Sequence, residues 1–331
     1  MTAVTFSADT RSASATRTSR AAAALTAALV MIAVSLTLLC SDRVRAGQLE
    51  GTRLTMAPTH IEYRTRPRIA IIIDDIGYNR PAGEKAVSLP GALTYAVIPF
   101  TPFGRKLAEM AYFSDKEVIL HLPMESTNRK KLDIGGITTR HSKWQVKDQI
   151  RSSLNRLPFA VGFNNHMGSM LTADEKAMSW IMEEVSATPL FFIDSMTNPH
   201  SIAYETANAY GVPSMRRDVF LDADPHPEKI EKAFQQLVRI AKRMGAAIGI
   251  AHPYPTTLDF LDTNIHKLGD YGVKLVSVSE LVTGTRRTPS LAGNAITEEP
   301  ETPEDAQWGS QKIIDYIADL PTPRSSRLSF Y

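Results

Sequence analysis

The chain has 331 residues, with 37 Lys and Arg against 35 Asp and Glu, and its formal net charge is +2. This near-neutral balance argues against a nucleic-acid partner, because nucleic-acid-binding domains carry a clear excess of positive charge. The single cysteine, Cys40, lies in an apolar N-terminal stretch, so the residues after it can form neither a disulfide framework nor a zinc-thiolate site.

Residues 1–46 predict an export signal or a membrane anchor. Residues 1–20 hold three arginines and one acidic residue, and residues 21–39 form an uncharged, almost wholly apolar run, a combination typical of both kinds of segment. Val-Arg-Ala at 44–46 favours cleavage, whereas the length of the run favours a membrane span, and the sequence leaves both open. In either case the basic flank stays in the cytoplasm and the rest of the chain is exported, with this segment as its only membrane contact.

Two further segments flank the predicted domain. Residues 47–66 are expected to be a linker. Residues 284–331 are rich in Thr, Pro, Arg and Glu and should form a largely disordered tail. A short amphipathic helix over Trp308–Leu320 is the alternative for part of that tail. Residues 67–283 remain as the folded domain.

This domain alternates between short apolar runs and amphipathic helical patterns, which predicts an α/β fold with a parallel sheet and crossover helices. Seven or eight βα units predict a distorted or seven-to-eight-stranded (β/α) barrel, with an open doubly wound sheet as the alternative. Strands are expected over residues 68–74, 93–98, 117–121, 159–163, 190–194, 212–215, 246–251 and 273–278. Helices are expected over residues 80–88, 103–114, 143–156, 173–187, 200–210, 226–244 and 256–270.

The first expected strand, Arg68-Ile-Ala-Ile-Ile-Ile-Asp-Asp-Ile-Gly77, ends in two adjacent carboxylates. Its unbroken apolar run is typical of a strand buried on both faces, and α/β folds place their chemistry at the carboxyl ends of such strands. Since neighbouring residues on a strand point to opposite sides, we expect Asp74 and Asp75 to have different functions. The alternative is that one caps the next helix and the other is a solvated turn residue.

Titratable residues recur at the carboxyl ends of the other strands, which should converge on one mouth of the barrel. A hydrolytic metal site needs two or three His or carboxylate ligands and an open position for water. Asp75, His121 and His166 could supply these ligands from three different strands. His121 taken alone could equally be a buried core histidine.

Other strand-end residues suggest catalytic functions. Asp74 is assigned as the general base that takes the proton of the attacking water, although spacing alone does not exclude that Asp74 and Asp75 exchange functions. His252 could protonate the leaving group, or it could simply bond the backbone before Pro253. Asp194 could orient His252 or be a further metal ligand.

Substrate contacts are expected beside these strands. Asn164 and Asn165 offer amide donors for a sugar or acyl oxygen, and Ser169 belongs to the same polar stretch. Glu125 ends the segment His-Leu-Pro-Met-Glu and is expected to be a helix or loop residue or a further substrate contact.

Six segments of the domain, taken in order, resemble the divergent polysaccharide deacetylase family: Ile-Asp-Asp-Ile-Gly, His-Leu-Pro-Met-Glu, Asn-Asn-His-Met-Gly-Ser, Phe-Ile-Asp-Ser-Met-Thr, Asp-Val-Phe-Leu-Asp and Ala-His-Pro-Tyr-Pro-Thr-Thr. The resemblance implies a β/α barrel of the glycoside hydrolase/deacetylase type in the periplasm or cell envelope. It also implies metal-dependent removal of N- or O-acetyl groups from an acetylated polysaccharide, with Asp74 as base and Asp75 on the metal.

The chain departs from the main polysaccharide deacetylases in its histidines. Those enzymes hold their metal with a His-x-x-x-His pair on one loop, and the eight histidines here form no such pair; the Arg-x-Pro-Tyr motif is also missing. His121 and His166 would therefore bind from separate strands. One divalent ion is expected, with zinc as the first choice and manganese, cobalt and nickel left open.

Two other functions remain as alternatives. The first is a non-catalytic envelope protein that binds a glycan or a partner in the same cleft. The second is a metal-free glycosidase that uses two carboxylates, for example Asp74 with Asp194.

Overall fold

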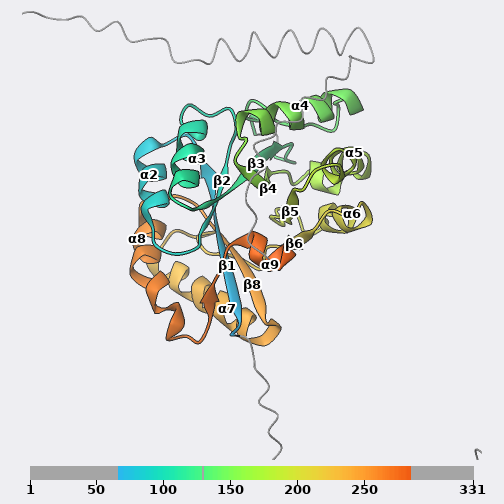
Figure 1. Ribbon diagram of the computed structural model, residues 1–331. Coiled ribbons are helices and arrows are strands. Elements are labelled where there is room, and N and C mark those ends of the chain that lie inside the picture. The colour runs from blue at the N-terminus through green and yellow to red at the C-terminus, as the bar shows by residue number, and fades with distance from the viewer. Residues whose placement is uncertain (1–65, 129, 285–331) are drawn as a thin grey trace, which may run out of the picture. The chain divides into compact units, whose positions relative to one another are not determined.

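The computed structural model describes residues 66–128 and 130–284 (Figure 1). The predicted export segment, most of the predicted linker and all but the first residue of the predicted tail lie outside these described residues. Among the described helices, none combines the length and the apolar character that a membrane span needs.

The described strands form one sheet, and each pair of neighbouring strands in it is parallel. Their order is β6-β5-β4-β3-β2-β1-β8-β7, and β9 pairs with β1. The strands are β1 (Arg68–Ile76), β2 (Thr94–Val97), β3 (Glu117–Met124), β4 (Ala160–Met167), β5 (Phe191–Asp194), β6 (Ser214–Arg216), β7 (Val219–Phe220), β8 (Ala246–Ala251) and β9 (Lys274–Leu275).

The two outer strands of this order, β6 and β7, are neighbours in the chain and are joined by Arg217 and Asp218 alone. The Arg217 N–H donates to the Asp194 carbonyl at 3.0 Å, and the Asp218 N–H donates to the Ile248 carbonyl at 2.9 Å. These two residues therefore bond to β5 on one side and to β8 on the other, and they bring the ends of the sheet together. The prediction of a distorted β/α barrel is confirmed, and the open doubly wound sheet is wrong.

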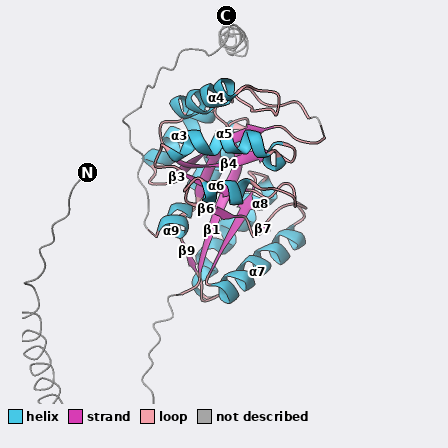
Figure 2. Cartoon of the chain, turned by 90° about the vertical axis from the view of Figure 1, so that its right-hand side faces the viewer, coloured by secondary structure: helices cyan, strands magenta, loops and turns pink. Residues whose placement is uncertain are grey.

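The described helices lie mostly around the outside of the strands (Figures 1 and 2). They are α2 (Arg80–Ser88), α3 (Gly104–Phe113), α4 (Lys143–Arg156), α5 (Glu175–Ser186), α6 (Ala203–Ala209), α7 (Pro227–Met244), α8 (Pro255–Asn264) and α9 (Val278–Thr283). The strand expected over 273–278 is wrong beyond Leu275, because the Ser277 hydroxyl accepts from the Glu280 N–H and begins helix α9 there.

Two apolar clusters divide the strand residues by the direction in which they face. Ile69, Ile71 and Ile73 belong to the large cluster that includes the helices, whereas Ala70 and Ile72 belong to a small one shared with residues of other strands and with Val278 of α9. The small cluster is therefore the interior of the barrel. On β1 the inward series continues from Ala70 and Ile72 to Asp74.

The same alternation governs two more strands. On β3, Ile119 is an interior residue and His121 follows it two positions later. On β8, Ile248 and Ile250 are interior residues and lead to His252. The barrel interior is thus apolar in its middle and ends in titratable side chains at the carboxyl ends of its strands.

Candidate functional site

Side chains from three strands, β1, β3 and β4, meet at the carboxyl end of the barrel. Asp75 Oδ1 lies 3.1 Å from His121 Nε2 and 2.9 Å from His166 Nδ1. The two imidazole nitrogens are 3.2 Å apart. In a tetrahedral zinc site with bonds of about 2.0 Å, neighbouring donor atoms are about 3.3 Å apart, so this triangle fits a small divalent ion. Asp75, His121 and His166 form the group of three potential ligands recorded among the described residues.

The far sides of both imidazoles are held by partners that prepare the facing nitrogens for a cation. His121 Nδ1 lies 2.7 Å from Asn164 Oδ1, and His166 Nε2 lies 3.1 Å from Asp133 Oδ2. Since both partners accept hydrogen bonds, a neutral ring at either position carries its proton on the far nitrogen and turns a lone pair toward Asp75. Three electron-pair donors around one point fit a metal ion, and partners of this kind usually orient metal-binding histidines.

A proton competes with a cation for this place. Burial lowers the pKa of His166, but its hydrogen bonds to Asp133 and Asp75 and their negative charges outweigh burial and raise that pKa to about 9. Burial also acts to raise the pKa of Asp75, yet the two histidines hold it well below its ordinary range. Cation binding should therefore release a proton and weaken as the pH falls.

Asp75 has a backbone conformation that explains its position. Its φ is +56°, and the pairing of β1 with β2 shifts register between Ile73 and Ile76. This bulge turns the chain, so the expectation that Asp74 and Asp75 point to opposite sides is wrong: Asp74 Oδ2 also lies within 3.6 Å of His121 Nε2. Left-handed backbone at a non-glycine residue costs free energy and is characteristic of functional sites.

Asp74 lies deeper than Asp75, with 2% of its surface exposed. Burial raises the pKa of its carboxyl, while His121, His252 and Asn164 act in the opposite direction. Asn164 Nδ2 donates to Asp74 Oδ1 at 2.8 Å, and the same amide accepts from His121 through its oxygen. Asn164 thus connects the carboxylate predicted to be the base with a histidine predicted to bind the metal.

His252 follows β8 and is bound to Asp222, which follows β7. The ring Nδ1 lies 2.8 Å from Asp222 Oδ1, and the His252 N–H donates to Asp222 Oδ2 at 2.7 Å. Burial lowers the pKa of His252, but Asp222 and the charges of Asp74 and Asp75 raise it to about 9. Because Asp222 holds Nδ1, Nε2 is the nitrogen that can give a proton to a substrate.

Asp194 does not have either of the contacts expected for it. Its Oδ1 accepts from the Met196 N–H at 2.8 Å, and its Oδ2 accepts from the Ser201 hydroxyl at 2.7 Å. Asp194 follows the interior residue Ile193 by one position, so its side chain faces away from the barrel interior. Asp222, and not Asp194, orients His252, and both Asp194 oxygens bind the loop after β5.

The remaining predicted contacts hold loops together. Asn165 Oδ1 accepts from the Ser195 N–H at 2.8 Å. The Ser169 hydroxyl accepts from the Thr127 N–H at 3.0 Å, and Glu125 Oε2 accepts from the N–H and the hydroxyl of Thr139, each at 2.8 Å. Their substrate-binding function stays a prediction.

Asp222 and Asp133 are functional candidates that the sequence alone did not single out. Asp222 could have been found, since it ends Phe-Leu-Asp at the close of a strand, as Asp194 ends Phe-Ile-Asp. Asp133 lies in the loop between β3 and α4 and gave no signal, yet it contacts both His166 and the Tyr78 hydroxyl.

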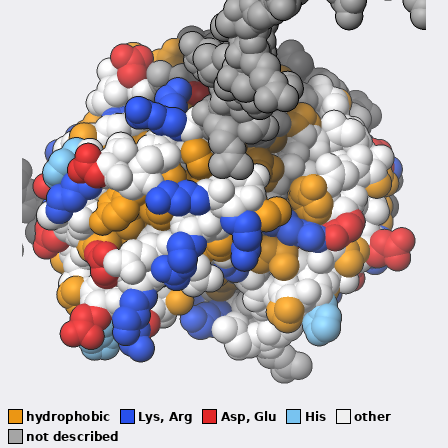
Figure 3. All heavy atoms as spheres, turned by 90° about the horizontal axis from the view of Figure 1, so that it is seen from below, with side chains coloured by type: hydrophobic (Ala, Val, Ile, Leu, Met, Phe, Trp, Pro, Cys, Tyr) orange, Lys and Arg blue, Asp and Glu red, His pale blue; other side chains and the backbone are white. Residues whose placement is uncertain are grey.

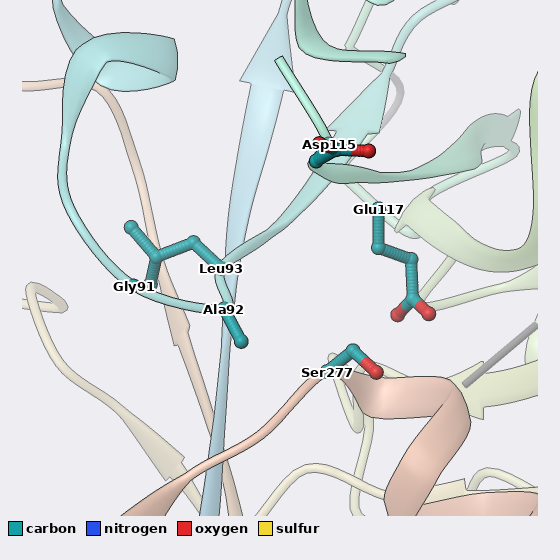
Figure 4. Close-up of a pocket in the computed structure, with 6 residues that line it drawn as sticks. All are labelled: Gly91, Ala92, Leu93, Asp115, Glu117 and Ser277. Atoms are coloured by element: carbon teal, nitrogen blue, oxygen red, sulfur yellow. The ribbon is translucent and has the colours of Figure 1, made fainter. Parts of the chain in front are cut away.

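A separate cavity of about 240 Å³ lies at the amino ends of β2 and β3 (Figure 4). Asp115 and Glu117 both line it, and the Glu117 carboxylate accepts from the Thr94 hydroxyl at 2.9 Å, from the Ser279 N–H at 3.1 Å and from the Ser279 hydroxyl. Burial raises the pKa of Glu117, while these donors lower it. The contacts fasten helix α9 across this end of the barrel, away from Asp74 and His252.

Comparison with known proteins places the chain in a family. A sequence profile described as divergent polysaccharide deacetylase matches residues 71–282. The uncharacterized protein YibQ of Escherichia coli K12 is 34% identical over 238 residues, which are 71% of this chain and 74% of that protein. An uncharacterized protein of Haemophilus influenzae Rd is 32% identical over 214 residues, 65% of this chain and 76% of that protein.

Among solved structures, an uncharacterized protein of Agrobacterium tumefaciens C58 has a similar fold, with a TM-score of 0.61 and 23% sequence identity. The similarity covers 66% of this chain and 89% of that one. The matched profile spans the barrel from β1 to α9 and includes Asp74, Asp75, His121, His166 and His252. The chain belongs to the divergent polysaccharide deacetylase family.

Proposed function

We propose that this protein is a metal-dependent hydrolase that removes acetyl groups from a polysaccharide. The observation that carries the proposal is the triangle of Asp75 Oδ1, His121 Nε2 and His166 Nδ1, whose longest side is 3.2 Å. A carboxylate and two imidazoles suit zinc, with manganese, cobalt and nickel as other choices. When bound there, a divalent ion would lower the pKa of a water molecule and polarise a substrate carbonyl.

The neighbouring side chains suit the proton transfers of such a reaction. Asp74 would take a proton from the attacking water. Asn164 Nδ2 holds this carboxylate by donating a hydrogen bond to Asp74 Oδ1. His252, with its pKa near 9, is protonated at neutral pH and would give a proton to the departing sugar oxygen or nitrogen. Asp222 holds that ring and stabilises its charged form.

Family membership supports an acetylated polysaccharide as the substrate class. The acetyl group can be N- or O-linked within this proposal. We further propose that the reaction takes place in the periplasm or cell envelope, as the sequence of residues 1–46 predicts. Separation of soluble, periplasmic and membrane fractions from producing cells would test this location, and a wholly cytoplasmic protein would contradict it.

Metal content is the first test. We expect about one tightly bound divalent ion per purified full-length chain, measured by plasma mass spectrometry. His166→Ala and Asp75→Ala should each lose it. His226→Ala is the matched control, because the His226 side chain is 81% exposed, and it should keep the ion. A correctly folded wild-type chain that cannot be loaded with zinc would contradict the metal site.

Acetate release is the second test. The metal-loaded chain should release acetate from acetylated hexosamine polymers, and the Asp74→Asn variant should bind the metal but release almost none. A wild-type chain that holds its metal and binds the polymer without releasing acetate would instead support a glycan-binding protein built on the same barrel.

A further inference from the structure

A group of cationic side chains lies at the end of the barrel opposite the candidate site. The Arg68 N–H donates to the Gly245 carbonyl at 2.9 Å, and the Lys274 N–H donates to the Pro67 carbonyl at 2.8 Å. These bonds hold the amino ends of three strands together. The cationic residues there, called the basic end below, are Arg66, Arg68, Lys242, Arg243 and Lys274.

The charge of the basic end is only partly compensated. Glu280 pairs with Lys274 at 3.5 Å, and its carbonyl oxygen accepts from Arg68. Arg66, Lys242 and Arg243 are exposed. Figure 3, which views the molecule from below Figure 1, shows Lys and Arg side chains across the middle of the face and acidic side chains mainly toward its edge.

Two of these cations have a simple local explanation. Lys242 and Arg243 lie in the last turn of helix α7, where positive charge stabilises the helix dipole. This explanation does not extend to Arg66 or Lys274, which precede a strand or lie within one. It also does not account for Met244, the last residue of α7.

Met244 is an apolar side chain in a cationic setting. It is 70% exposed, although most large apolar side chains in this barrel are buried. Gly245 follows with φ +87° and turns the chain into β8, which leaves Met244 at the corner beside Lys242 and Arg243. An exposed apolar side chain among cations suits the boundary between lipid headgroups and acyl chains.

The chain reaches the barrel at this same end, since Arg66 and Pro67 lead directly into β1. The apolar run that predicts an export signal or anchor ends at residue 39, so 26 residues, 40–65, connect it to the basic end. Fully extended, they reach at most about 90 Å. A membrane anchor would thus keep the basic end at high local concentration beside the bilayer.

We propose that the basic end binds the anionic headgroups of a lipid bilayer and that Met244 enters the interface between headgroups and acyl chains. The carboxyl ends of the strands, with Asp74 and His252, then face away from the bilayer. This arrangement leaves the candidate site open to a polymer. The proposal does not depend on deacetylation, because it rests on the opposite end of the barrel.

The test uses the full chain with Cys40→Ser, so that one introduced cysteine carries a fluorophore. Met244→Cys labels the basic end, and Met170→Cys, 44% exposed in the loop after β4, labels the opposite end as the control. The chain is reconstituted into vesicles of phosphatidylcholine alone or mixed with phosphatidylglycerol. A spin-labelled lipid headgroup in either vesicle quenches fluorophores that lie near it.

In the phosphatidylglycerol vesicles, quenching at position 244 should exceed quenching at position 170 by about threefold, and high salt should remove most of this difference. Combined Lys242→Glu, Arg243→Glu and Lys274→Glu substitutions should abolish it. Equal quenching at the two positions, or the same difference in vesicles of phosphatidylcholine alone, would overturn the proposal.

Discussion

Strand β3 carries a buried titratable residue at each end of the barrel interior, and the two ends differ in their neighbours. At the amino end, Glu117 is 5% exposed, and at the carboxyl end Asp74 of β1, 2% exposed, lies beside His121. Burial raises the pKa of both carboxyls. Glu117 is surrounded by hydroxyl and N–H donors, whereas Asp74 is surrounded by imidazoles and an amide.

A raised carboxyl pKa therefore does not by itself identify an active site. The donors around Glu117 neither gain nor lose protons near neutral pH, so they can only hold the carboxyl in place. The charge of His252 acts on Asp74, and the pKa of about 9 at His252 allows that ring to give up a proton as the pH rises. The neighbouring Asp75, with its side chain 36% exposed, also gives solvent access to this end.

The largest effect is expected in acetate release, which should depend on Asp74 and not on Glu117. Asp74→Asn should lower the rate of acetate release by about 10²–10⁴-fold, because an amide cannot accept the proton of water. Glu117→Gln, the matched substitution at the other end, should stay within about twofold of the wild type, since its contacts only fasten a helix. Equal losses in the two variants, with both folded, would contradict the division between the ends.

The second-largest effect concerns how the rate of acetate release depends on pH. If protonated His252 is the acid, as proposed, the rate of acetate release should fall as the pH rises through the pKa of His252, about 9. Asp222→Asn removes the negative charge that raises this pKa. The alkaline limb of the rate profile should then move to lower pH by about one unit or more.

A second Asp–His pair provides the control for this experiment. Asp224 also contacts a histidine, His226, but that ring is 81% exposed. Asp224→Asn should leave the pH–rate profile unchanged. An alkaline limb that does not move in Asp222→Asn would exclude His252 as the acid.

Much of the barrel could be predicted from the sequence because parallel strands buried on both faces have a clear signature. Ile69 to Ile73 are all buried, as an unbroken apolar run requires. The alternation of side-chain direction along a strand could also have predicted which way Asp194 and His252 face. Asp194 follows interior residue Ile193, so strand periodicity already turns it outward, whereas His252 follows Ile250 by two positions and faces inward.

The bulge at Asp75 and the Asp222–His252 pair could not be predicted, because both depend on how strands pair in the folded sheet. The bulge at Asp75 depends on pairing between β1 and β2, and an Asp-Asp sequence does not reveal a positive φ. The Asp222–His252 pair joins residues 30 positions apart and needs β7 beside β8, yet β7 has only two residues. Short strands have too few residues to show a period.

The third effect concerns stability at the amino end. Because the carboxyl pKa of Glu117 is raised above its ordinary value of 4.5, the folded state binds this proton more tightly than the unfolded state does. Its contribution to the free energy of unfolding is therefore greatest below pH 4.5 and is lost as the pH rises through the raised pKa. Glu117→Gln cannot titrate, so its stability relative to the wild type should increase with pH across this window.

Urea unfolding of the full chain between pH 4 and 8 measures this difference. Ser279→Ala supplies a second measurement, because it removes one donor from the buried carboxylate and should lower the free energy of unfolding by about 1–3 kcal/mol. A constant difference between Glu117→Gln and the wild type at every pH would show that Glu117 does not titrate in the folded protein.

The smallest expected effect lies at the rim of the carboxyl end. Ser169 was predicted to contact substrate, and its hydroxyl already accepts from the Thr127 N–H at 3.0 Å and lies 3.1 Å from the Thr127 hydroxyl. If holding this exposed loop is its whole function, Ser169→Ala should cost about 1 kcal/mol of stability or less and leave kcat unchanged. A KM raised by about tenfold with unchanged kcat would instead establish a substrate contact, because such a change means the loss of uniform binding.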